Sequence, residues 1–330
     1  MSSQRIHFSP GCELPAYAVD PRLSHPEQCS PASEQADGRV MVLNEDSEIL
    51  AHAALWWTSA PPLAGENPGV IGGFDALDEK TAETCLDAAC EQLQEQGCSI
   101  ALGPMNGNTW RRYRFVTESS GRPPFLLEPT HPENHPKWWQ AAGFDELAQY
   151  SSSLMALPCE AATRPRLRER FAKSGLVIRE LEHARYDEEL AAIHALSLKS
   201  FANNFLYTPL DEESFIHSYH KVREHVDPRF VRVAERDGQL CGFVFAIPDL
   251  NALARSEKPA LIVKTLAVDP EARCPGLGSL LVDIVQENAA QAGFTESIHA
   301  LQHENNSSLR ITARNAGEKF RRYTLFSKSL

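Results

Sequence analysis

The amino-acid sequence predicts an α/β fold arranged as two consecutive domains. The chain has 330 residues, which is long for one domain and a natural length for two. Residues 261–292 have the pattern of a buried strand, a glycine-containing turn and an amphipathic helix. The first half shows a similar order of strands and helices without a similar sequence, so we expect two related folds in tandem.

The strand and the helix of residues 261–292 are defined by their apolar residues. The strand, Leu261 to Val268, is almost wholly apolar and is followed by Asp269 and Pro270, which favour a turn. From Leu277 onwards, apolar residues recur with the 3.6-residue period of a helix. Gly293 can end this helix, because glycine readily adopts the left-handed conformation of a cap.

The turn between them, from Arg273 to Gly278, is suited to bind a phosphate. A turn that leads into a helix directs backbone N–H groups and the positive end of the helix dipole at one place. This turn is no Walker loop, because Ser279 and not lysine follows Gly278. It also lacks the third glycine of the dinucleotide fingerprint, where Leu281 stands. The sequence therefore predicts a pyrophosphate site of another class.

Further strands are expected around this unit. Residues 231–235 and 240–245 predict a hairpin around Asp237-Gly238, a dipeptide typical of tight turns. Residues 296–303 predict a neighbouring strand, and residues 320–326 predict the last strand of the chain.

The first half repeats this order with a different turn. Residues 39–57 predict two strands, residues 68–74 a third, and residues 81–96 a helix that Gly97 ends. Residues 98–104 and 137–144 then predict a strand and a short helix. Asp75 to Lys80 stand where the second half has its glycine turn, and their three acids are unsuited to a pyrophosphate.

These features resemble the Gcn5-related N-acetyltransferase (GNAT) superfamily. Arg273 to Gly278 match its Arg/Gln-x-x-Gly-x-Gly/Ala turn, and Leu266 to Pro270 match the Leu-x-Val-x-Pro strand end before it. Asn305 to Ser308 are similar to the family's Asn-x-x-Ala/Ser helix start. The resemblance implies two acyl-CoA N-acyltransferase-like domains, each a mixed, mostly antiparallel sheet with flanking helices. The expected division is a degenerate first domain (1–160), a linker (161–174) and an acetyltransferase domain that binds acetyl-CoA (175–330).

The resemblance also implies where acetyl-CoA would bind as co-substrate. The pantetheine arm would lie along the end of the central strand, and N–H groups of the turn would hold the pyrophosphate, although Pro275 has none to give. The degenerate first domain would bind no coenzyme A. The expected coenzyme-binding residues are Leu266, Ala267, Val268, Arg273, Cys274, Gly276, Leu277, Gly278, Ser279 and Asn305.

The general base and the general acid are less well defined by the sequence. Alternation along the strand places Ile262 and Lys264 on the same face as Leu266, and Lys264 would need a strongly lowered pKa to act as a base. Thr312 stands where the family usually has its tyrosine acid. The candidate catalytic residues are therefore His299 and Glu304 as bases and Tyr323 as acid, with core packing as the other role of His299.

Two segments are candidates for the acceptor side. Residues 201–209 are polar and aromatic, and their other role is helix capping and packing. Residues 103–114 are aromatic and basic, and either hold an acidic or carbonyl-bearing acceptor or form a surface connection. The expected function is transfer of acetyl from acetyl-CoA to an amine of a small molecule or a protein. The alternative is a catalytically weak CoA-binding sensor or scaffold.

The composition limits the class of protein. The net charge of -12 argues against a nucleic-acid partner, and no run approaches the ~20 apolar residues that a membrane span needs. The eight cysteines include no Cys-x-x-Cys pair, and prolines interrupt the pair His131 and His135, so we expect no metal. Residues 164–170 predict a solvated, arginine-rich linker helix. A cytoplasmic location is expected, and a homodimer is left open.

Overall fold

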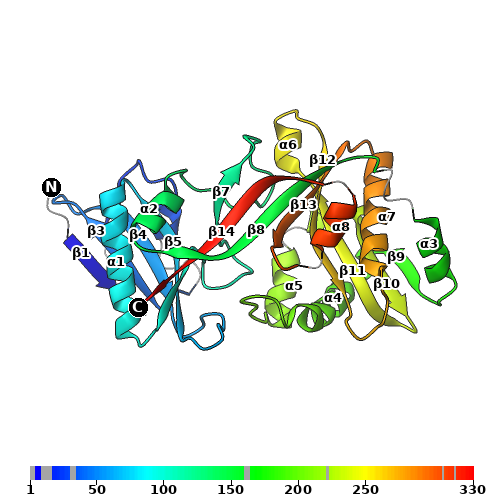
Figure 1. The fold of residues 1–330 in the computed structure, drawn as a ribbon, viewed down its shortest axis with the longest axis horizontal. Helices are drawn as coiled ribbons and strands as arrows, with labels where there is room; N and C mark the ends of the chain where they lie inside the picture. The colour runs from blue at the N-terminus through cyan, green and yellow to red at the C-terminus, as the bar shows by residue number, and fades with distance from the viewer. Residues whose placement is uncertain are drawn as a thin grey trace.

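A single sheet of 14 strands runs through both halves of the molecule, with helices on its faces (Figure 1). The computed structural model of the chain describes residues 4–8, 17–29, 35–159, 164–220, 223–306, 308–315 and 317–330. The strand order is β1-β3-β4-β5-β6-β14-β8-β13-β12-β11-β10-β9, with β2 beside β4 and β7 beside β14. The α/β class and the mostly antiparallel sheet are confirmed.

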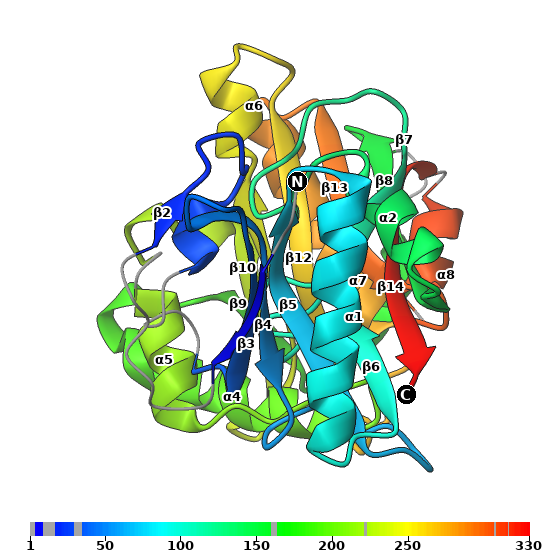
Figure 2. The same cartoon turned by 90° about the vertical axis from the view of Figure 1, so that its left-hand side faces the viewer.

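The first lobe is built from the elements up to residue 156. Its helix α1 packs on β3, β4 and β5 (Figure 2). Its elements are β1 (Gln4–Phe8), β2 (Ala18–Val19), β3 (Gly38–Leu43), β4 (Glu48–Trp56), β5 (Pro68–Ala76), α1 (Glu79–Glu95), β6 (Ile100–Gly103), β7 (Phe115–Ser119), α2 (His135–Ala141) and β8 (Asp145–Ala156).

The second lobe contains the remaining elements. Its helices α4 and α5 pack together, and α7 packs on β11 and β12. Its elements are α3 (Pro165–Ala172), β9 (Val177–Glu180), α4 (Tyr186–Phe201), α5 (Glu212–His220), β10 (Val231–Arg236), β11 (Gln239–Pro248), α6 (Leu250–Ala254), β12 (Ala260–Val268), α7 (Leu277–Gln291), β13 (Glu296–His303), α8 (Leu309–Arg314) and β14 (Glu318–Ser329).

Most elements lie where the sequence predicts them. The hairpin β10–β11 turns at Asp237 and Gly238, whose φ angles of 52° and 75° are those of a tight turn in the left-handed region. Helix α1 starts with a capping box, in which Asp78 accepts the N–H of Thr81 at 2.8 Å. Helix α7 starts instead at Gly276, with no side-chain cap.

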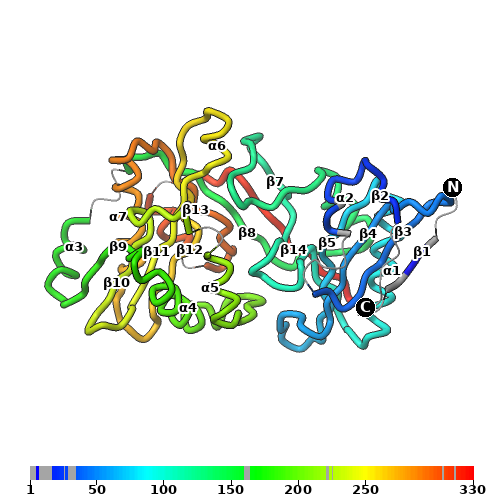
Figure 3. The backbone as a smooth tube through the Cα atoms, turned by 180° about the vertical axis from the view of Figure 1, so that it is seen from behind, coloured from blue at the N-terminus to red at the C-terminus, as the bar shows by residue number. Residues whose placement is uncertain are grey.

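The two lobes exchange strands. β14 belongs to the second half of the sequence, yet its residues 326–329 pair with β6 of the first lobe. β8 comes from the first half and pairs with β13 of the second lobe through residues 150–156. The two strands pair with each other along most of their length and cross the middle of the molecule (Figure 1). In Figure 3 the C-terminus accordingly lies in the same lobe as the N-terminus.

The crossing strands bury a polar network where the lobes meet. The Tyr323 hydroxyl donates to Glu128 at 2.5 Å and contacts Ser152 Oγ at 2.9 Å. Arg321 forms an ion pair with the same Glu128 carboxylate at 2.9 Å, and both side chains are buried. The domain boundary at residue 160 stays a prediction. Because the strands are exchanged, each lobe depends on residues from the other half of the sequence.

Candidate active site

The candidate site lies where two parallel strands of the second lobe separate. β12 and β13 pair from Ala260 with Glu296 to Val263 with His299, and pair no further. A bulge in β12 falls at Lys264, because Ala246 of β11 faces Val263 while Phe245 faces Thr265. The parting strands leave backbone groups without a strand partner, which is what an extended ligand needs.

This bulge corrects the expected alternation along β12. Ile262 packs with Phe125 and Ile298 on one face of the sheet, whereas Leu266 packs against the core beneath α7 on the other. The extra residue reverses the order of faces after Lys264, so Ile262 and Leu266 do not share a face. Lys264 lies at this bulge, where the surrounding protein desolvates its ammonium group and lowers its pKa.

The end of β12 turns backbone groups into this gap. Asp269 donates its N–H to the carbonyl of Cys241 in β11 at 2.9 Å. Because hydrogen-bonded pairs alternate along an antiparallel ladder, the backbone groups of Leu266 and Val268 then point away from β11. The hydroxyl of Ser200 in α4 bonds to the carbonyl of Val268 at 3.2 Å from that side, which agrees with this orientation.

The predicted pyrophosphate turn has the geometry of an anion-binding site. Arg273 and Gly276 have positive φ angles, 48° and 90°. A Cβ on Gly278 would lie 3.3 Å from Leu266, so the turn sits directly on the end of β12. Within the described part of the chain, no hydrogen-bond partner is found for the N–H groups of Arg273, Cys274, Gly276, Gly278 and Ser279. These residues fit a pyrophosphate, because free N–H groups and the helix dipole both favour an anion.

The linker helix α3 packs on this site and is not simply solvated. Arg164 forms an ion pair with the buried Asp283 of α7 at 2.8 Å, and Arg168 forms one with Glu287. The pKa of Asp283 is nevertheless raised to about 7, because burial outweighs its arginine partners. Arg170 donates to the carbonyl of Pro275 in the turn. The sequence shows the arginines but not that α3 folds back onto α7.

His299 is buried on the side of the sheet that faces α7 and α8. The hydroxyl of Thr312 donates to Gln302 at 2.9 Å, so His299 Nδ1 must donate to Thr312 at 2.8 Å. His299 Nε2 then accepts from the amide of Gln286 at 3.2 Å. Burial lowers the pKa of His299 to about 3. With both ring nitrogens engaged, this geometry favours packing over proton transfer at neutral pH.

A pH-dependent stability is expected from His299. The unfolded side chain binds a proton below its usual pKa of 6.5, whereas the folded one does not until about pH 3. Stability due to this group is therefore present above pH 6.5 and is lost as the pH falls, by up to about 1.4 kcal/mol per pH unit. Denaturant unfolding from pH 7.5 to 4 should show a shallower loss for His299→Gln than for the unchanged protein. His52 and His131 also have lowered pKa values, but they are present in both proteins. If the unfolding free energy of the two proteins fell equally with pH, the lowered pKa assigned to His299 would be wrong.

The other candidate residues are dispersed. Tyr323 is fully buried between Glu128 and Ser152, and burial raises its pKa. Glu304 is exposed at the end of β13. Asn305 is also exposed, and it is Asn306 whose side chain accepts the N–H of Ser308 at 2.8 Å before α8. The structure therefore brings the turn and the end of β12 together, and leaves Glu304 as the candidate base with free access to solvent.

The acceptor-side loop of residues 201–209 contacts the first lobe. Trp110 donates its indole N–H to the carbonyl of Thr208 at 2.7 Å, and its ring packs against Tyr207. Tyr219 of α5 packs edge-on to Phe245 of β11, and burial raises its pKa to about 12. Tyr219 was not predicted, because nothing in the local sequence distinguishes it from a packing residue.

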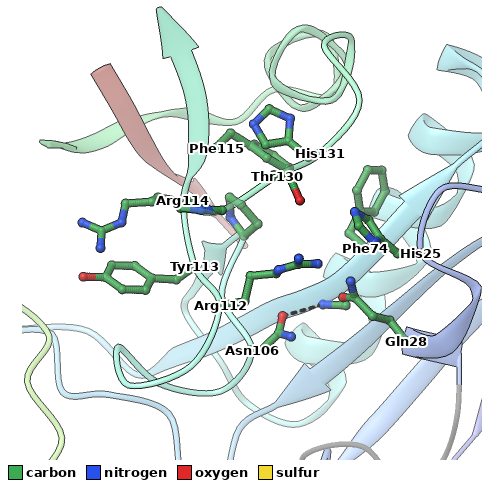
Figure 4. Close-up of a pocket in the computed structure, with 13 residues that line it drawn as sticks. His25, Gln28, Phe74, Asn106, Arg112, Tyr113, Arg114, Phe115, Thr130 and His131 are labelled. Carbon is green, nitrogen blue, oxygen red and sulfur yellow. Dashed lines mark hydrogen bonds between the residues drawn. The ribbon is translucent and has the colours of Figure 1, made fainter. Parts of the chain in front are cut away.

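A pocket lies at the equivalent position of the first lobe (Figure 4). β5 and β6 pair in parallel from Pro68 with Ile100 to Val70 with Leu102, and then separate. Phe74, Asn106, Arg112 and His131 contribute to the pocket wall. Arg112 points into the pocket, whereas Arg114 points to the opposite side of its loop. Asp78 caps the N-terminus of the adjacent α1 with its own carboxylate, so the anion-binding site of the second lobe has no counterpart here.

Known proteins resemble the chain at several levels. Residues 190–317 match the acetyltransferase (GNAT) family model. The bacterial ceramide synthase of Caulobacter vibrioides is 24% identical over 209 residues, which cover 61% of this chain and 53% of that protein. Protein YghO of Escherichia coli is 24% identical over 194 residues, covering 57% and 48%. The chain thus spans about half the length of these curated relatives.

A solved structure extends the likeness to both lobes. The GCN5-related N-acetyltransferase from Sphaerobacter thermophilus has a TM-score of 0.53 and 13% identity, covering 88% of this chain and 80% of that one. No helix within the described residues is long and apolar enough to cross a membrane. The same residues contain no cluster of three or more side chains arranged to hold a metal ion. Residues 190–317 thus match the acetyltransferase (GNAT) family model, within a chain that has the GNAT fold.

Proposed function

We propose that the chain transfers an acetyl group from acetyl-CoA to an amine of a small molecule or a protein, at the gap between β12 and β13. The observation that carries this proposal is the turn from Arg273 to Ser279. Five of its N–H groups have no partner among the described residues, and its Gly278 lies against Leu266 at the end of β12. The family match over residues 190–317 and the synthase name of one curated relative support transfer as the activity.

In this proposal the turn and the strand end share the binding of the donor. N–H groups of Arg273, Gly276 and Gly278 hold the pyrophosphate, and Arg170 adds a positive charge at the rim of the turn. Backbone groups of Leu266 and Val268 bind the pantetheine arm in the gap. The thioester of bound acetyl-CoA supplies the activated acyl group.

The chain's own groups then prepare the acceptor. The amine must be neutral to attack a thioester, so a base has to accept its proton directly or through water. Glu304 is the candidate for this role, because it is exposed at the end of β13, whereas His299 is buried. Tyr219, whose ring packs against Phe245 of β11, is the candidate to donate a proton to the leaving thiolate.

The first lobe is proposed to bind no coenzyme A. The Asp78 carboxylate already accepts the N–H of Thr81 at the start of α1, and a second anion there would be repelled. Its role in this proposal is to complete the acceptor cleft, through the loop of residues 103–114. The division into residues 1–160, 161–174 and 175–330, a cytoplasmic location and the absence of nucleic-acid and membrane partners belong to the same proposal.

The test is isothermal titration of the purified protein with acetyl-CoA, followed by measurement of free thiol release with a panel of amines. One site per chain with amine-dependent thiol release is the expected result. One site without release for any amine would favour the sensor or scaffold alternative. Two sites would show that the first lobe also binds the donor, and no binding would overturn the proposal.

A further inference from the structure

Arg114 is a buried cation that has no acidic partner within the described part of the chain. Its side chain is 5% exposed, and its guanidinium carbon lies 3.8 Å from the ring centre of Tyr113 and 4.1 Å from that of Tyr150. Its Nη1 donates a long hydrogen bond to the carbonyl of Leu301, at 3.4 Å. Among the described residues, its Nε has no hydrogen-bond partner and no carboxylate forms an ion pair with its guanidinium.

This arrangement is costly unless something else compensates the charge. A guanidinium has five N–H donors, and a buried donor left unpaired, as Nε is here, costs free energy. Two aromatic faces offset part of this cost through cation–π contacts, but they do not replace hydrogen-bond acceptors. The backbone at Arg114 is also held at a φ of 64°, in the left-handed region. The fold therefore holds this cation in place at an energetic cost.

The position of Arg114 connects it to the proposed acceptor cleft. Its loop comes from the first lobe, and Trp110 of the same loop bonds to the acceptor-side loop at Thr208. Leu301, which accepts the hydrogen bond from Arg114, lies in β13 just beyond the point where β13 leaves β12. Leu301 has a φ of 57°, and the pairing of β13 with β8 shifts register there. Arg114 thus lies beside the end of the gap where the donor's acyl group would meet an acceptor.

The groups next to Arg114 can also donate hydrogen bonds to an anion. The ring of His303 packs edge-on to Tyr150 at 4.9 Å and lies near Phe205 of the acceptor-side loop. His303 Nδ1 accepts the N–H of Asn305 at 3.1 Å, so the neutral ring carries its proton on Nε2. Burial lowers the pKa of His303, and the charge of the neighbouring acid Glu304 opposes this shift.

We infer that Arg114 binds a carboxylate carried by the acceptor, so that the first lobe selects which amines reach the acyl group. A carboxylate is planar and accepts two parallel hydrogen bonds, which matches the fork of a guanidinium. That the carboxylate belongs to an amine acceptor rests on the proposed acyl transfer. That Arg114 binds an anion rests only on the geometry around Arg114. The acceptor class is then an amine that bears a carboxylate.

The first test compares the stability of variants without any ligand. Arg114→Met keeps an unbranched side chain between the two rings and removes the charge. If the charge is held for a ligand, the variant should be at least as stable as the unchanged protein, because an uncompensated buried charge has been removed. Arg112→Met is the matched control, since Arg112 lies two residues away and points to the opposite side of the loop (Figure 4). A clear drop in the melting temperature of Arg114→Met alone would show a structural role and overturn the inference.

The second test measures the anion directly with acetate and acetamide, which differ in charge but hardly in shape. Acetate should raise the melting temperature of the unchanged protein saturably, beyond the effect of sodium chloride at the same ionic strength, and acetamide should not. The acetate effect should persist in Arg112→Met and vanish in Arg114→Met. Equal responses of the unchanged protein and Arg114→Met would overturn the inference.

The two proposals fail in different ways. Titration of Arg114→Met with acetyl-CoA should give the same affinity as the unchanged protein, because Arg114 lies on the acceptor side and not at the turn. If the unchanged protein did not bind acetyl-CoA, the proposed function would be overturned. The acetate result would still decide whether Arg114 is an anion site.

Discussion

Gly278→Glu is expected to abolish the binding of acetyl-CoA. Gly278 lies in the first turn of α7, and a Cβ there would point toward Leu266 and Val268 at the strand end. The added carboxylate would lie at the same anion-binding site as the pyrophosphate and would repel the pyrophosphate. We expect the affinity to fall at least ~100-fold, which corresponds to about 2.8 kcal/mol. Isothermal titration of both proteins measures the change.

The matched control for this variant is Gly278→Gln, which adds nearly the same atoms without the charge. Its affinity should lie between those of the unchanged protein and Gly278→Glu. An acidic residue in the first turn of a helix is stabilising by about 0.3–1 kcal/mol, so Gly278→Glu should not unfold α7. Circular dichroism melting checks this point. Binding of acetyl-CoA by Gly278→Glu within threefold of the original affinity would show that the turn does not hold phosphate.

Phe326→Ala is expected to destabilise both lobes together. Phe326 is fully buried in the first lobe, where its ring packs near Phe115 and Trp139. Truncation of a buried phenylalanine costs about 3–5 kcal/mol of unfolding free energy. Phe326 belongs to β14, whose earlier residues pair with β8 beside the second lobe. We therefore expect one cooperative transition, shifted to lower denaturant concentration.

The measurement follows guanidinium unfolding by tryptophan fluorescence and by loss of acetyl-CoA binding. Every tryptophan lies in the first half of the sequence, and the proposed donor site lies in the second. Because Trp110 also contacts Thr208 of the second lobe, the fluorescence reports mainly the first lobe, and acetyl-CoA binding reports the second. Leu253→Ala is the control, because Leu253 is 44% exposed on α6 and should change stability by less than about 0.5 kcal/mol. Two separate transitions in the unchanged protein would contradict the shared-strand argument.

Local patterns were sufficient to predict most elements of this fold. The apolar run of β12, the Asp-Gly turn of β10–β11 and the amphipathic period of α7 depend on neighbouring residues only, and each lies where it was expected. The exchange of β8 and β14 depends on pairing between residues far apart in sequence. No turn residue or period encodes that choice, so the sequence alone could not predict it.

The site was predicted unevenly for the same reason. The turn from Arg273 to Gly278 is a contiguous motif, and its geometry is set by neighbouring residues, among them Arg273 and Gly276 with positive φ angles. The roles of side chains on β12 and β13 depend on which face they occupy, and one bulge at Lys264 was enough to reverse that assignment. Arg114 escaped notice as a single residue, because its lack of an acidic partner is a property of the assembled molecule.

The pairing of β6 with β14 also sets the order in which the protein can be completed during its synthesis. Residues 100–103 leave the ribosome more than 200 residues before residues 326–329, their partners in the sheet. Until then β6 and β8 border an unfilled slot, and unpaired strand edges invite pairing with other chains. The first lobe, although made first, is therefore closed last, and a chain that stops short of its final strand leaves that slot exposed.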